Sequence, residues 1–163
     1  MYTIGERLSG GTSDTVYRAI IQDTTGAVAI LGVDSWTNKL ATLLEVYTLE
    51  RCLDHHVHAV RILDISLDRH PPQVHVVMEL WGLSGDDYRE SKGYGREDAQ
   101  PANQVRRLLL HLCRALPFLH HGLGFAHTDV KLANILVIDT PESLIGDIDC
   151  KLADFGSVEE VGT

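Results

Sequence analysis

Short apolar runs separated by turn residues predict that the first part of the chain is mostly β-strand. Strands of this length, bounded by Gly, Pro, Thr or Ser, are typical of antiparallel hairpins. The runs are Val16–Ile21, Ala27–Leu31, Val60–Ile65 and Val74–Leu80, and the turns include Leu8–Ser13, Thr24–Gly26 and Pro71-Pro72. The glycines of the first turn predict a glycine-rich loop at the head of the first hairpin.

Two stretches space their apolar residues three or four positions apart, which predicts helices. The first runs from Leu40 to Leu53, and the second, clearer one from Val105 to His120. Pro117 is expected to kink or end the second helix, because proline removes a backbone donor. The apolar stripe of that helix is predicted to be core: Val105, Leu108, Leu109, Leu112, Leu116 and Leu119.

The order of the elements predicts an α+β fold. Residues 81–100 are polar and rich in Gly and Asp, which indicates a connector. Two apolar runs near the end, Asn134–Ile138 and Lys151–Phe155, predict a hairpin. Strands, a helix, strands, a helix and a hairpin do not alternate as βαβ units do. We expect three parts: residues 1–80, 81–103 and 104–163.

Composition narrows the classes of function. The net charge of -9 argues against nucleic-acid binding, which needs a basic surface, and is compatible with a basic peptide substrate. The three cysteines form no Cys-x-x-Cys pair, which favours a reducing compartment. No apolar run reaches the roughly 18 residues of a membrane helix. We therefore expect a cytoplasmic or nuclear protein with no membrane contact.

The strongest chemical signal is a pair of motifs in the last third of the chain. Residues 127–134 read His-Thr-Asp-Val-Lys-Leu-Ala-Asn, and residues 154–156 read Asp-Phe-Gly. Phosphoryl transfer needs a carboxylate at the attacking hydroxyl, cations at the phosphates, and ligands that hold those cations. The two motifs contain all three kinds of group, although two unrelated polar turns would be the alternative interpretation.

Each of these groups has an expected role. Asp129 would orient the hydroxyl and accept its proton, and Lys131 would contact the transferred phosphate. Asn134 and Asp154 offer the oxygen ligands that magnesium prefers. Asp129 and Lys131 are therefore the candidate catalytic residues, and Asn134 and Asp154 the candidate metal ligands.

The two motifs resemble the catalytic loop and the magnesium loop of eukaryotic protein kinases. Thr128 within His-Thr-Asp, and Ser157 after Asp-Phe-Gly, resemble the SR-protein kinases and the LAMMER (CDC2-like) kinases, with fungal-type SR-protein kinases nearest. The resemblance implies a kinase-like fold: an N-lobe over residues 1–80, a hinge and connector over 81–103, and the start of a C-lobe over 104–163. It also implies ATP and Mg²⁺ as cofactors and serines of Arg-Ser-rich proteins as substrates.

The same resemblance implies a set of nucleotide-contacting residues in the first half. Met78 would be the gatekeeper beside the adenine, and Asp86 or Asp87 would reach the ribose. The other implied nucleotide contacts are Gly10, Gly11, Val16, Ala29, Glu79 and Trp81, together with Asn134 and Asp154.

The chain departs from the kinase pattern in its first half. Ser9 and Asp14 occupy two positions where kinases carry glycine. Leu31 stands where a lysine normally binds the phosphates and pairs with a helix glutamate, here assigned to Glu45. Arg18 lies on the same predicted strand face as Val16 and is a candidate substitute charge, although a solvated strand residue is the plainer interpretation.

These departures leave three hypotheses open. The first is an ATP-dependent serine/threonine kinase, of which this chain is a partial copy. The second is a pseudokinase or nucleotide-binding scaffold without turnover, and the third is an inactive remnant. The chain ends nine residues after Asp154, so we expect little transfer activity from it alone.

Two histidine clusters are interpreted as surface or packing residues rather than metal sites. Neither cluster has an acidic or cysteine partner at ligand spacing along the sequence. The clusters are His55, His56 and His58, and His120 and His121.

Overall fold

A computed structural model describes residues 2–10, 14–21, 27–33, 56–69, 72–94, 101–140 and 148–161. The chain forms two compact units: Met1–Asp54 with Arg61–Leu80, and His55–Val60 with Trp81–Thr163. The predicted helix Leu40–Leu53, with Glu45, lies outside the described residues. Within the described ranges no helix is both long and apolar enough to cross a membrane.

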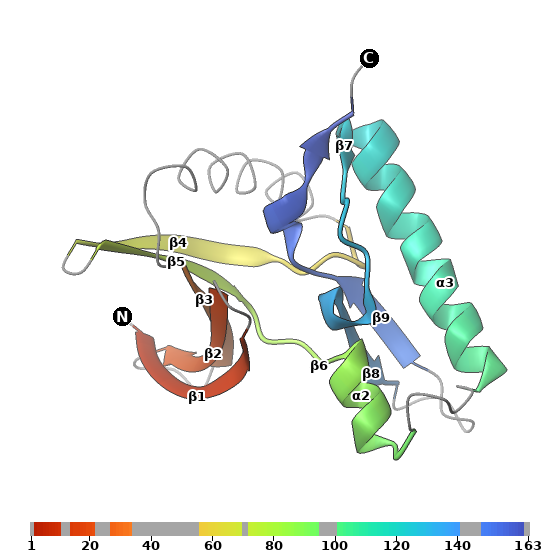
Figure 1. Ribbon diagram of the computed structural model, residues 1–163, viewed down its shortest axis with the longest axis horizontal. Coiled ribbons are helices and arrows are strands. Elements are labelled where there is room, and N and C mark those ends of the chain that lie inside the picture. Colours follow the sequence, from red (N-terminus) through yellow and green to blue (C-terminus); the bar gives the residue numbers. More distant parts are fainter. Residues whose placement is uncertain are drawn as a thin grey trace. The chain divides into compact units, whose positions relative to one another are not determined.

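The first unit contains a five-stranded sheet (Figure 1), and its antiparallel arrangement agrees with the prediction. Its order is β1-β2-β3-β5-β4, so β3 lies in the middle. Pro72 begins β5, a position where proline is tolerated because no ladder donor is needed there. The strands are β1 (Tyr2–Gly10), β2 (Asp14–Ile21), β3 (Ala27–Val33), β4 (Ile62–Arg69) and β5 (Pro72–Glu79).

Side chains that alternate along the central strands form the buried core on one face of this sheet. Val28 and Ile30 are each 2% exposed and lie on one face of β3. Ala19 of β2 and Val77 of β5 join them in one buried cluster. A register slip of one residue would turn these side chains to the opposite face, so burial fixes the pairing.

The second unit is built around a three-stranded sheet, with order β6-β8-β9. The predicted final hairpin is confirmed as β8 (Ile135–Asp139) and β9 (Ile148–Leu152), and α3 (Ala102–Pro117) packs on β9 (Figure 1). The remaining elements are β6 (Leu83–Ser84), α2 (Gly85–Ser91), a π-helical turn η1 (Phe118–Gly122), β7 (Phe125–Ala126), the 3-10 turns η2 (Leu132–Asn134) and η3 (Phe155–Ser157), and β10 (Glu159–Glu160).

The polar stretch 81–100 is not only a connector, because it contains the helix α2. Ser84 caps this helix: its Oγ accepts a hydrogen bond from the Asp87 backbone N–H at 3.1 Å and donates one to Asp87 Oδ2 at 2.6 Å. Asp86 and Asp87 lie in the first turn, where negative charge is favourable. The helix has only seven residues, too few to show a clear apolar period.

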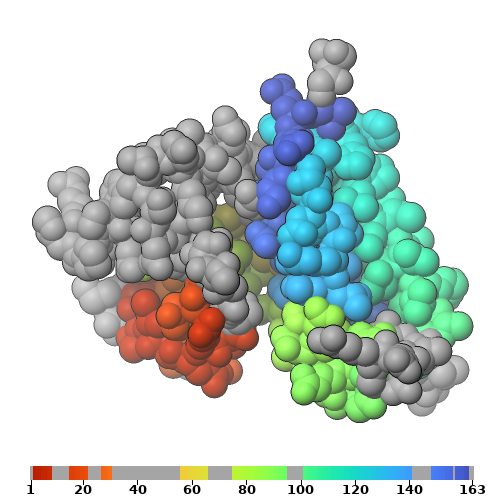
Figure 2. Space-filling model, in the orientation of Figure 1, coloured from red at the N-terminus to blue at the C-terminus, as the bar shows by residue number. Residues whose placement is uncertain are grey.

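The predicted apolar stripe of α3 is partly wrong. Pro117 does end the helix, but Val105 and Leu109 are 39% and 53% exposed. Leu119, in η1, is buried as predicted, and the other buried positions are Gln104, His111 and Ala115. These residues share a helical line that is rotated from the leucine stripe, because His111 faces Cys150 on β9. Figure 2 shows α3 at the surface of the second unit.

Candidate active site

The loop between β7 and β8 holds the first motif in a hydrogen-bonded arrangement. The Asn134 side-chain Nδ2 donates to the Asp129 backbone O at 2.9 Å and to Asp129 Oδ2 at 3.0 Å. Lys131 Nζ donates to the same Oδ2 at 2.7 Å. Asn134 is 6% exposed and closes the 3-10 turn η2, its backbone N–H donating to Lys131 O at 2.9 Å. The fold therefore fixes the Asp129 carboxylate from two sides.

These contacts stabilise the charged forms of both side chains. The hydrogen bond from Lys131, and then that from Asn134, lowers the pKa of Asp129 below its ordinary value. The same bond to Asp129 raises the pKa of Lys131, to which the charge of Asp154 also contributes. Asp129 is therefore ionised and Lys131 protonated at neutral pH.

The second motif is joined to the first through backbone contacts. The Ala153 N–H donates to Asn134 O at 2.9 Å, and Asp154 follows directly. Asp154 is exposed and has a φ of 60°, in the left-handed region. The second unit thus gathers Asp129, Lys131, Asn134 and Asp154 in one region. Since Asn134 uses its amide nitrogen on Asp129, its side-chain carbonyl oxygen is the atom suited to a cation.

His127 is a structural link that the sequence did not assign a role. Its ring is 1% exposed, and Nε2 lies 3.1 Å from the carbonyl oxygen of Ala153. Because a carbonyl only accepts, Nε2 carries the hydrogen. Burial lowers the pKa of His127, so the ring is neutral at neutral pH. The ring also meets Phe155 edge-on, with centroids 5.4 Å apart. His127 is thus a buried histidine that holds the first motif against the residues around the second motif.

The implied nucleotide residues of the first unit lie on its strands. Gly10 ends β1, Val16 lies on β2 and Ala29, 8% exposed, on β3. Gly11 is outside the described residues. Glu79 ends β5, and its backbone N–H already donates to Arg61 O at 3.0 Å, within the same unit.

The departures from the kinase pattern also have places in this sheet. Leu31 on β3 pairs in register with Val16 on one side and Val76 on the other. Arg18 Nη1 lies 3.4 Å from Glu6 Oε1, and the Arg18 side chain is 50% exposed. The Arg18 charge is thus shared with a surface carboxylate.

Three further implied residues lie in the second unit. The Lys151 ammonium lies 5.3 Å from the centroid of the Trp81 ring. Asp86 and Asp87 are exposed, but the Asp87 carboxylate accepts the cap hydroxyl of Ser84. Of the two aspartates, Asp86 lacks that cap contact.

Comparison with known proteins agrees with this arrangement. The protein kinase domain family matches residues 2–163. The chain is 31% identical to CBL-interacting protein kinase 4 of Oryza sativa subsp. japonica, covering 95% of this chain and 32% of that protein. It is 30% identical to the serine/threonine-protein kinase ULK3 of Mus musculus, covering 98% and 32%. For the human dual specificity protein kinase CLK2 the identity is also 30%, covering 92% and 30%.

The chain spans about a third of the length of these relatives. The matching residues include the antiparallel sheet of the first unit and both motifs of the second. The α+β fold is consistent with the family match, and the chain therefore belongs to the protein kinase domain family.

Proposed function

We propose that the protein belongs to a serine/threonine kinase that transfers the terminal phosphoryl group of Mg-ATP to a protein hydroxyl. The observation that carries the proposal is the arrangement of Asp129, held by Lys131 and Asn134, beside Asp154. It offers a carboxylate, a cation and oxygen ligands, the groups that phosphoryl transfer uses. The printed names of the similar proteins are those of kinases.

Each residue has a proposed task. Asp129, which is ionised at neutral pH and whose pKa Lys131 lowers further, accepts a hydrogen bond from the substrate hydroxyl and takes its proton as the phosphate bond forms. Lys131 turns its ammonium from Asp129 toward the transferred phosphate. Asn134 and Asp154 hold magnesium through oxygen atoms, and the bound ion supplies the charge that offsets repulsion between the phosphates and the nucleophile.

The proposed substrate is an Arg-Ser-rich protein. The His-Thr-Asp motif with Thr128, and Ser157 after Asp-Phe-Gly, support this class through the resemblance to SR-protein kinases. The net charge of -9 is favourable for a basic substrate, because opposite charge steers association.

A second candidate function is nucleotide binding without turnover. Leu31 in the middle strand β3 favours it, because leucine cannot bind phosphate or pair with a glutamate. Asp14, at the start of β2, adds a negative charge close in sequence to the loop that would cover the phosphates. Both candidates require a formed Mg-ATP site, and only the first requires transfer.

The test measures binding and transfer separately. Calorimetry with Mg-ATP reports the site, and phosphate incorporation into an Arg-Ser peptide reports turnover. We expect the 163-residue chain to bind Mg-ATP and to transfer slowly. Asp129→Asn should lower transfer by at least about a hundredfold while keeping nucleotide affinity. Glu90→Gln, at an exposed position of α2, is the control and should change neither.

The variant Leu31→Lys separates the two candidates. If the chain is a kinase with a weakened phosphate contact, the added ammonium should raise transfer by about tenfold or more. If Mg-ATP binds but neither the wild type nor Leu31→Lys transfers phosphate, the binding function holds instead. A chain that does not bind Mg-ATP at all contradicts both candidates.

A further inference from the structure

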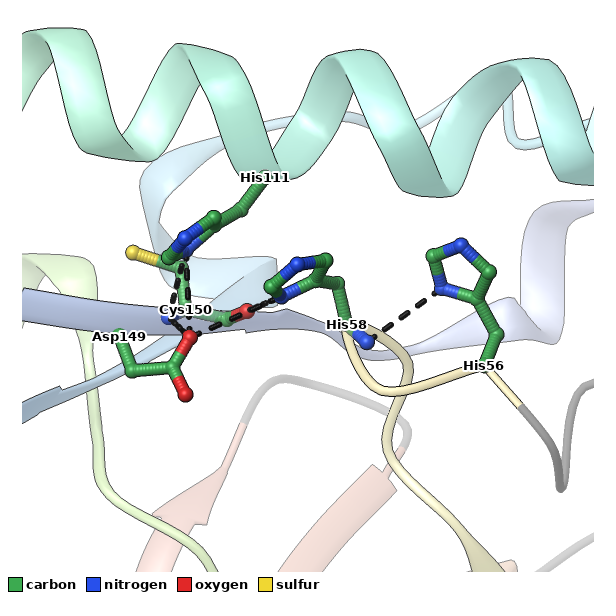
Figure 3. A network of polar contacts seen from close by, with 5 residues as sticks. All are labelled: His56, His58, His111, Asp149 and Cys150. Carbon is green, nitrogen blue, oxygen red and sulfur yellow. Dashed lines mark hydrogen bonds and ion pairs between the residues drawn. The ribbon is translucent and has the colours of Figure 1, made fainter.

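A second cluster of ionisable side chains lies in the same unit, outside the candidate active site. His58 comes from the 55–60 segment, His111 from α3 and Asp149 from β9 (Figure 3). Ring nitrogens of the two histidines and a carboxylate oxygen of Asp149 all lie within 4.8 Å of one another. This cluster could not be predicted from the sequence, because its members are 53 and 38 positions apart.

The contact between His111 and Asp149 is unusual. His111 Nδ1 accepts the Cys150 backbone N–H at 3.1 Å, and Asp149 Oδ1 accepts the same N–H at 2.8 Å. The two acceptor atoms are only 3.2 Å apart. Two acceptor atoms this close repel each other unless a proton or a metal ion lies between them. The contact therefore suits a shared proton or a bound cation.

His58 completes the cluster with an incompletely satisfied ring. Its Nδ1 lies 3.2 Å from the Cys150 carbonyl oxygen and 3.6 Å from Asp149 Oδ1. Its Nε2 is buried and has no hydrogen-bond partner among the described residues. Because the Cys150 carbonyl only accepts, Nδ1 now carries the ring hydrogen, and binding of an ion through Nδ1 requires this hydrogen to move to Nε2.

We propose that His58, His111 and Asp149 form a binding site for a divalent transition-metal ion of the zinc class. Imidazole nitrogens with one carboxylate suit zinc rather than magnesium. Zinc bonds of about 2.0–2.1 Å in a tetrahedron place ligand atoms about 3.3 Å apart. The two separations from Asp149 Oδ1, 3.2 and 3.6 Å, lie on either side of that value.

The surroundings allow the ion to enter and be held. The two imidazole side chains are each 7% exposed, whereas the Asp149 side chain is 40% exposed and gives access from solvent. The exposed side leaves the fourth coordination position to water. The rings stack with centroids 4.0 Å apart, and small rotations about the soft Cβ–Cγ bond turn their nitrogens toward one ion. The ion then replaces the ring contacts to Cys150.

A metal ion at this site would link the 55–60 segment, α3 and β9. The 55–60 segment already joins β9 through the Val60 N–H to Leu152 O bond at 2.9 Å and the Leu152 N–H to His58 O bond at 2.9 Å. The ion adds α3 to this contact through His111. Binding to the folded state alone raises stability in proportion to the logarithm of the free metal concentration.

The test titrates the metal-stripped 163-residue chain with Co²⁺, then displaces it with Zn²⁺. We expect one equivalent of cobalt with the visible absorption of a tetrahedral site, and a melting temperature that rises with zinc. Asp149→Asn, at a half-exposed position, should weaken cobalt binding by at least about tenfold. His111→Gln should do the same. His121→Gln, at an exposed histidine, and Asp154→Asn, in the proposed magnesium site, should leave it unchanged.

Several results would overturn the proposal. One is the absence of stoichiometric cobalt binding, and another is full cobalt binding by Asp149→Asn. The Asp149 variant therefore tests the proposal even if the variant of the buried His111 does not fold. Loss of the cobalt signal in Asp154→Asn alone would assign the ion to the kinase site. A cluster that responds to pH but not to zinc holds a proton only.

Discussion

The side-chain hydroxyl of Thr128 donates a hydrogen bond to the backbone carbonyl of Ser157. Thr128 has a φ of 58°, a conformation that is unfavourable for a β-branched residue. The bond joins the residue before Asp129 to the 3-10 turn that contains Phe155 and follows Asp154. The hydroxyl therefore offsets part of the cost of the backbone conformation while it connects the two motifs.

Thr128→Val should destabilise the chain by about 1 kcal/mol, because it removes the donor and keeps the branched Cβ. Thr128→Ser keeps the donor and relieves the branching, so its stability should equal or exceed that of the wild type. Urea unfolding of the three proteins measures the difference. Equal stabilities for the valine and serine variants would show that the Ser157 contact contributes nothing.

Leu119→Ala should cost about 2–5 kcal/mol, since its side chain is 0% exposed and its removal leaves a cavity in the second unit. Leu109→Ala is the matched control. That side chain is 53% exposed on α3, so the change should stay within about 0.5 kcal/mol. The same unfolding experiment compares them. A large loss at Leu109 would mean that its face of α3 is covered in solution.

Tyr88 connects α2 to the last residue of β8 through a hydrogen bond. Its hydroxyl donates to Asp139 Oδ1 at 2.7 Å, and Lys92 Nζ donates to Asp139 Oδ2 at 2.7 Å. Lys92 first, and then Tyr88, lowers the pKa of Asp139. Tyr88→Phe should cost about 1–2 kcal/mol, because Tyr88 is 3% exposed and its bond is to a charged group.

Lys92→Met serves as the comparison for Tyr88→Phe. The Lys92 and Asp139 side chains are 38% and 53% exposed, so losing this ion pair should cost about 1 kcal/mol or less. Thermal unfolding at low and high salt separates the effects, because only the ion pair is screened. A greater loss for Lys92→Met than for Tyr88→Phe would contradict the order.

The stability of the chain should fall as the pH drops below about 6.5, the ordinary pKa of histidine. Burial lowers the pKa of His127 in the folded state, so the unfolded state binds a proton first. The contribution of His127 to the free energy of unfolding is complete above that pH and decreases below it. The slope of this free energy against pH is at most about 1.4 kcal/mol per pH unit. His127→Asn should reduce this slope in urea unfolding between about pH 7 and pH 5. An unchanged slope would show that His127 does not titrate differently on folding.

The sheet and the two motifs could be predicted because their signals are local. Val28 and Ile30 alternate with a period of two, and the Asp129 and Asp154 motifs are short strings with fixed spacing. The roles given to the motif residues stay predictions until they are tested. The helix α2 was missed because a seven-residue helix made of polar residues shows little periodicity.

The buried face of α3 was assigned only in part, for a different reason. Apolar character alone favoured Leu109, but packing turned His111 toward β9, where the Cys150 backbone offers a hydrogen bond. Such a polar contact joins residues distant in the sequence, and one sequence does not reveal it. The His58, His111 and Asp149 cluster was hidden in the same way.

The short segment before β4 has a consequence for how the protein could be divided. Ala59 and Val60 are 1% and 4% exposed, and Ala59 pairs in parallel with Leu152 on β9. Residues 59–60 thus extend the edge of a sheet whose strands β8 and β9 are synthesised near the end of the chain. If the polypeptide is cut at residue 80, the C-terminal fragment loses the segment that pairs with β9, and the N-terminal fragment exposes the apolar, unpaired residues 59–60. Each fragment expressed by itself should therefore aggregate, and soluble protein should be recovered only when both fragments are refolded together.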